Sequence, residues 1–121
     1  MRDLFNPGTD LTALATANVT GKTFVTYAGD MKEGNITVKP AAAGGHVAGV
    51  AKYDAGTDNL VGVARGSSRI LTVITSTALT AGDPVQAGAN GQATKATDGI
   101  IVGWAVHNAK ANTDAYISLA H

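Results

Sequence analysis

The chain has 121 residues and equal numbers of basic and acidic side chains, nine of each, so its formal net charge at pH 7 is zero. A neutral chain without runs of like charge lacks the surface expected of a protein whose main partner is nucleic acid or an anionic membrane, and neither partner is expected. Because there is no cysteine, disulfides, zinc thiolate sites and thiol nucleophiles are excluded.

The first twenty residues are predicted to form an extended N-terminal arm ahead of the rest of the chain. Thr, Ala and Asn dominate residues 9–20, which offer Leu11 and Leu14 as anchors, and a short helix over residues 10–17 is the alternative. An acidic residue at position 3 and the lack of an apolar stretch argue against a signal peptide. This segment is therefore treated as an arm, with the folded domain starting at residue 21.

Residues 21–121 are predicted to form an all-β domain, a small β-sandwich or barrel of about eight or nine short strands. A single Glu, abundant Thr and Val, and frequent Gly disfavour helices. Turn residues recur about every ten positions, a spacing typical of sandwiches and barrels. The predicted strands are residues 23–27, 35–39, 46–53, 59–64, 69–75, 83–87, 92–95, 100–107 and 114–119.

Two short sequences recur at nearly the same offset. Residues 28–30 (Ala-Gly-Asp) recur as residues 81–83, and residues 47–55 recur as residues 101–109, so the offsets are 53 and 54. Residues 60–64 form a third, shorter copy of the second pattern. Two matches in register favour a partly duplicated β motif over coincidence.

Gly49 and Gly103 occupy the same place in the longer repeat, inside predicted strands. Glycine weakens a strand, so its presence there indicates a bulge, a sharp bend or the close approach of another backbone. All three explanations are compatible with the sequence.

The sequence contains no recognisable catalytic or metal-binding motif. His46, His107 and His121 are not spaced as ligand pairs, so a metal site would need long-range assembly, and solvated imidazoles are the simpler interpretation. None of the four serines lies in a Gly-x-Ser-x-Gly motif, and the aspartates occupy turns where Asp is favoured locally. We therefore expect no catalytic residue, no metal site and no cofactor, and a protein that is not an enzyme.

Burial is the simplest explanation for several aromatic residues of the predicted strands, namely Phe24, Tyr27, Trp104 and Tyr116. Trp104 is expected at the centre of the core. The alternative is a small β-barrel that binds carbohydrate or a virion tail component, with Trp104, Tyr53 and turn aspartates lining its site.

Three segments of the second half carry a more specific pattern. Residues 79–85 read Leu-Thr-Ala-Gly-Asp-Pro-Val, residues 99–105 read Gly-Ile-Ile-Val-Gly-Trp-Ala, and residues 113–119 close the chain with alternating apolar positions. Together they resemble the entry segment, the glycine-containing strand and the final strand of tailed-phage capsid cement proteins, also called head-decoration proteins. Residues 26–64 look like a first copy of the same unit.

The resemblance implies a non-enzymatic structural protein of the bacteriophage virion, made in the host cytoplasm and bound to the outer surface of the icosahedral capsid. The implied partners are the major capsid protein, whose subunits it would clamp together, and further copies of the same chain, with a homotrimer favoured. Contacts to capsid or to neighbouring copies are expected from the arm, at Arg2, Leu4, Phe5, Leu11 and Leu14.

Overall fold

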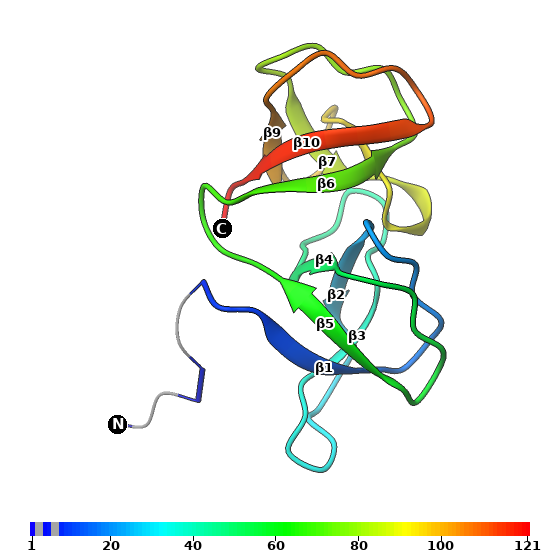
Figure 1. The fold of residues 1–121 in the computed structure, drawn as a ribbon, viewed down its shortest axis with the longest axis vertical. Coiled ribbons are helices and arrows are strands. Elements are labelled where there is room, and N and C mark those ends of the chain that lie inside the picture. The colour runs from blue at the N-terminus through cyan, green and yellow to red at the C-terminus, as the bar shows by residue number, and fades with distance from the viewer. Residues whose placement is uncertain (2–3, 6–7) are drawn as a thin grey trace.

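Ten strands form two closed barrels of five strands each within residues 1, 4–5 and 8–121, the part of the chain that the computed structural model describes (Figure 1). The first barrel contains β1 (Leu11–Ala15), β2 (Phe24–Tyr27), β3 (Thr37–Pro40), β4 (Gly49–Ala51) and β5 (Leu60–Ala64). The second contains β6 (Ile70–Thr75), β7 (Pro84–Ala87), β8 (Ala93–Lys95), β9 (Gly103–Ala105) and β10 (Thr113–Leu119), with a short 3-10 turn, η1 (Ala89–Gly91), between β7 and β8. The all-β prediction is confirmed.

The two barrels have the same topology. The strand order is β1-β3-β2-β4-β5 in the first and β6-β8-β7-β9-β10 in the second, each closed on itself. Each barrel has one parallel pair, β1 with β3 and β6 with β8, and its other pairs are antiparallel. The predicted duplication is therefore present, as two complete barrels in tandem.

The structural register of the repeat differs in part from the sequence match. The pair Ala13–Val61 of the first barrel corresponds to Val73–Ala115 of the second, so the offset is 60 residues in β1 and 54 in β5. The longer sequence match, at offset 54, is confirmed. The match of residues 28–30 with residues 81–83 is coincidental, because the first follows β2 whereas the second precedes β7.

Residues 60–64 are also not a third copy. They form β5, the neighbour of β4 in the first barrel, and their counterpart in the second barrel is β10. The change of offset arises mainly between β2 and β3, where the connection spans residues 28–36, whereas the matching connection between β7 and β8 spans residues 88–92. The extra residues form the hairpin that projects from the lower barrel in Figure 1.

Close backbone approach explains the glycines of the repeat. A Cβ on Gly103 would lie 2.5 Å from the carbonyl oxygen of Ser118, and a Cβ on Gly49 would collide in the same way with the carbonyl oxygen of Ala64. Each glycine begins its strand and faces the next strand of its own barrel. Of the three explanations offered by the sequence, the approach of another backbone is the one that the structure shows.

The predicted arm is too long. Residues 11–15 form β1, which pairs with β3 and β5 and closes the first barrel. Leu11 points into that barrel and is only 2% exposed. The physical reason is that a barrel this small accepts alanine at inward positions, so a strand whose one β-branched residue, Thr12, points outward still fills its share of the interior. The start of the β domain therefore lies near residue 11 instead of residue 21.

The barrels pack closely against each other. The side chains of Phe24 and Val50 point away from the first barrel and join the apolar cluster of the second, which includes Val73 and Leu79. The backbone N–H of Ile74 donates to the carbonyl of Lys22, 2.9 Å away. The second barrel thus covers one outer face of the first, and Figure 1 shows β2 and β4 on that side.

Candidate interaction surfaces

The expected contact residues of the arm fall into different environments. Leu4 and Phe5 are exposed, by 62% and 41%. Arg2 lies outside the described residues. Leu11 is buried in the first barrel, so its assignment as a contact residue is wrong, whereas Leu14 lies on the outer face of β1 and is half-buried.

Asp10 fastens the start of β1 to the rest of the molecule. Its carboxylate forms an ion pair with Lys52, 2.7 Å away, and a second with Arg69, the last residue of the link between the barrels. The hydrogen bonds from Lys52 and Arg69 hold the pKa of the Asp10 carboxyl below its ordinary value of 3.8. Just before it, the carbonyl of Thr9 accepts a hydrogen bond from Arg65, so the chain is tied down immediately after Gly8.

Replacing Asp10 with Asn should lower stability by about 1 kcal/mol, because two partly exposed ion pairs are lost, and should lower Tm by about 3–6 °C. A depressed pKa contributes stability above the unfolded value, and this contribution disappears as the pH falls through the folded value. The difference in Tm between wild type and Asp10→Asn should therefore be constant near neutral pH and shrink below pH 3.8. Calorimetry across this range checks the prediction, and a difference that persists unchanged at low pH contradicts it.

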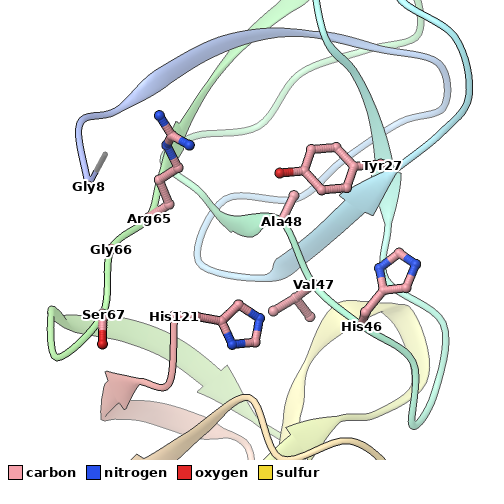
Figure 2. Close-up of a pocket in the computed structure, with 9 residues that line it drawn as sticks. All are labelled: Gly8, Tyr27, His46, Val47, Ala48, Arg65, Gly66, Ser67 and His121. Carbon is pink, nitrogen blue, oxygen red and sulfur yellow. The ribbon is translucent and has the colours of Figure 1, made fainter. Parts of the chain in front are cut away.

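A groove of about 590 Å³ lies where the two barrels meet (Figure 2). Its polar side chains are Tyr27, His46, Arg65, Ser67 and His121. The ring of His46 is held by a hydrogen bond of 2.8 Å between its Nδ1 and the hydroxyl of Thr26. None of the described residues that line the groove has a side-chain carboxylate to pair with an imidazole.

The remaining histidine, His107, belongs to the surface of the second barrel. Its Nε2 accepts a hydrogen bond from the backbone N–H of Tyr116, and the two rings lie 4.9 Å apart. Among the described residues, no group of three or more His, Cys, Asp or Glu side chains could hold a metal ion. Nor is any helix of the described chain long and apolar enough to cross a membrane.

Exposed aromatic and aliphatic side chains gather on the outside of the second barrel. Trp104 is 44% exposed and Tyr116 53%, so the expectation that both are buried is wrong. Tyr27 is likewise 50% exposed, whereas Phe24 is buried as expected. Trp104 lies in β9, where Gly103 and Ala105 face the interior and the residue between them must point outward.

Trp104 and Tyr53 belong to different barrels. Trp104 lies in the second barrel, whereas Tyr53 follows β4 of the first, and neither lines the groove of Figure 2. The carbohydrate-binding alternative placed both side chains in one site, and nothing in the described part of the chain brings them together there.

Comparison with known proteins identifies a related fold. No family model matches the chain, and no curated protein matches it. Among solved structures, the N base of head fiber gp8.5 from bacteriophage phi29 matches with a TM-score of 0.78 and 23% sequence identity, covering 93% of this chain and 93% of that one. The similarity therefore extends along nearly the whole of both chains and shows that they share a fold.

Proposed function

We propose that the chain is a phage head-decoration protein, a non-enzymatic component that binds the outer surface of the icosahedral capsid and stabilises contacts between major capsid protein subunits. The observation that carries the proposal is the fold shared with the phi29 head fiber base over 93% of both chains. The cement-protein pattern of residues 79–85, 99–105 and 113–119 supports the same location from the sequence.

The proposed mechanism rests on repeated weak contacts. A cyclic oligomer, with a homotrimer favoured, presents the same surface to each capsid subunit around a local symmetry axis, so that individually weak contacts combine through effective concentration. Because such an oligomer binds only the assembled lattice, it stabilises that lattice by mass action. The neutral charge of the chain fits a protein partner.

The exposed residues before Gly8 are the proposed capsid contact of the arm. Leu4 and Phe5 present apolar side chains, and the chain behind them is fixed by the Asp10 ion pairs. When an anchored segment with apolar side chains binds a partner, the apolar area that it buries contributes a favourable free energy of about 25 cal/mol per Å².

Binding to capsids tests the proposal. Purified protein should cosediment with expanded, undecorated heads of the phage that encodes it, and Leu4→Ser/Phe5→Ser should bind at least about tenfold more weakly. Met31→Ser is the matched control, because Met31 is also exposed, by 42%, but lies in the β2–β3 hairpin. Failure of the wild-type protein to bind such heads contradicts the proposal, and equal binding by the arm variant contradicts the role of the arm.

A second candidate is the base of a head fiber, and the comparison favours it because the matched structure is such a base. The two candidates differ in what stands above the capsid. A fiber base carries density that extends outward beyond the two barrels, whereas a decoration protein ends with them.

A further inference from the structure

One outer row of side chains is covered in the first barrel. Phe24 pairs with Val50 and Val50 with Ala64, so these three side chains form a row across β2, β4 and β5. All three are less than 5% exposed. Phe24 and Val50 are buried by the second barrel, whose η1 turn lies against the backbone of Phe24 at Gly91.

The equivalent row of the second barrel is open. Pro84 pairs with Trp104, Trp104 with Ser118, and Ser118 with Ile70, so this row crosses β7, β9, β10 and β6. Pro84 lies 60 residues after Phe24, and Trp104 lies 54 residues after Val50, which are the offsets of the repeat. Trp104 is 44% and Ile70 57% exposed. We call these four residues the open row.

The surface of the second barrel that covers the first can also be located. Ile74 and Asp114 are paired across β6 and β10, and both contact Lys22. The N–H of Ile74 donates to the carbonyl of Lys22, and the Asp114 carboxylate lies 3.0 Å from the Lys22 ammonium.

The equivalent pair of the first barrel is apolar and open to solvent. It consists of Leu14 and Leu60, paired across β1 and β5, and Leu60 is 51% exposed. We call it the leucine pair. The N–H of Leu14 already donates to the carbonyl of Ile36, so the leucine pair offers side chains to a partner instead of a backbone hydrogen bond.

We propose that the open row of one copy of this chain receives the leucine pair of a second copy. Within the chain, the side of the second barrel that carries Ile74 and Asp114 lies beside the covered row of the first, because both residues contact Lys22, two positions before Phe24. Each barrel therefore leaves one of these two positions exposed, the open row in the second barrel and the leucine pair in the first, and apolar side chains predominate in both. Such a contact is head to tail, and it forms a ring when the rotation between copies closes.

The proposal rests on the proposed function, which calls for an oligomer. It deepens that function by naming the surface through which the copies associate. The residues at the positions equivalent to Lys22 and Asp114 fit this interpretation. Where the contact within the chain has the Lys22–Asp114 ion pair, the contact between copies would have Gly82 and Leu60, so the charged pair gives way to uncharged positions.

Self-association of the free protein tests the proposal. Sedimentation velocity should show oligomers whose population rises with concentration, and the emission of Trp104, the single tryptophan, should shift to the blue over the same range. Ile70→Lys and Leu60→Asp should each weaken association at least tenfold while leaving the far-UV circular dichroism unchanged. Tyr27→Lys is the matched control, since Tyr27 is 50% exposed but lies in the groove of Figure 2.

A double variant tests the register of the contact. Gly82→Lys combined with Leu60→Asp recreates between copies the ion pair that Lys22 and Asp114 form within the chain. A Cβ on Gly82 would meet no atom within 4 Å, and Lys22 shows that lysine adopts a positive φ, of 62°, at the equivalent position; the φ of 90° at Gly82 adds some backbone strain, which Gly82→Lys alone measures. The double variant should recover at least part of the association lost in Leu60→Asp.

The outcomes separate this proposal from the proposed function. A protein that stays monomeric at all concentrations, or one whose association is lost in Tyr27→Lys but kept in Ile70→Lys, overturns the docking surface. Failure of the double variant to recover any association overturns the register. An oligomer with these mutational responses that does not bind heads supports the surface and contradicts only the proposed function.

Discussion

Phe24→Ala is expected to lower the free energy of unfolding by about 3–5 kcal/mol, the range for truncating a buried phenylalanine. Phe24 is fully buried, and its side chain is part of the contact between the barrels. Because a small domain has about 5–15 kcal/mol of stability in total, this loss should bring the protein close to unfolding at room temperature.

Urea denaturation followed by circular dichroism measures the effect of Phe24→Ala. Phe5→Ala is the matched control, since Phe5 is 41% exposed, and its effect should stay within about 0.5 kcal/mol. A loss of less than about 1 kcal/mol in Phe24→Ala would show that the barrels do not depend on this contact.

Gly103→Ala is expected to destabilise the second barrel by about 2–3 kcal/mol, within the range for overpacking. The added Cβ would lie 2.5 Å from the Ser118 carbonyl oxygen and 2.8 Å from Cγ2 of Ile117, and the backbone oxygen belongs to the neighbouring strand. Relief of the collision therefore requires β9 and β10 to move apart.

Thermal unfolding compares Gly103→Ala with Gly56→Ala, in which the new Cβ meets the Asn59 side chain at an ordinary contact distance of 3.4 Å. Gly103→Ala should lose about 6–15 °C in Tm, whereas Gly56→Ala should change little. Equal Tm values for the two variants would contradict the close approach of β9 and β10.

Local sequence signals predicted most of the strands, whereas β1, which the sequence analysis missed, depends on the size of the barrel. Turn residues and β-branched runs mark β2, β5, β6, β7 and β10 in the sequence. Residues 11–15 lack both signals, since a Leu/Ala strand becomes stable only inside a barrel narrow enough for alanine. The residue pattern alone does not give the width of the barrel.

The direction of side chains was harder to predict where the sequence does not alternate. Residues 100–106 are uninterrupted apolar positions, so periodicity indicates burial without saying which side faces the core. The structure resolves this, since Gly103 and Ala105 face the barrel and Trp104 faces out. The repeat accounts for the outward direction, because the position equivalent to Trp104 in the first barrel is Val50, which also points outward and is buried by the second barrel.

The candidate surfaces, too, could be predicted from the sequence only in part. Exposure of Leu4 and Phe5 agrees with the expected contact role of the arm without testing it. Leu14 remains accessible for another reason, as part of the leucine pair. The duplication was visible in residues 47–55 and 101–109, but the surface it leaves open required the strand pairings of both barrels.

Cryo-electron microscopy of heads incubated with the purified protein tests the central claim most directly. Head decoration predicts ordered density for the two barrels on the outer capsid surface, in contact with at least two major capsid protein subunits. The density should also place the open row of one copy against a neighbouring copy. Heads that carry no added density, or barrels bound inside the shell, would contradict the assignment.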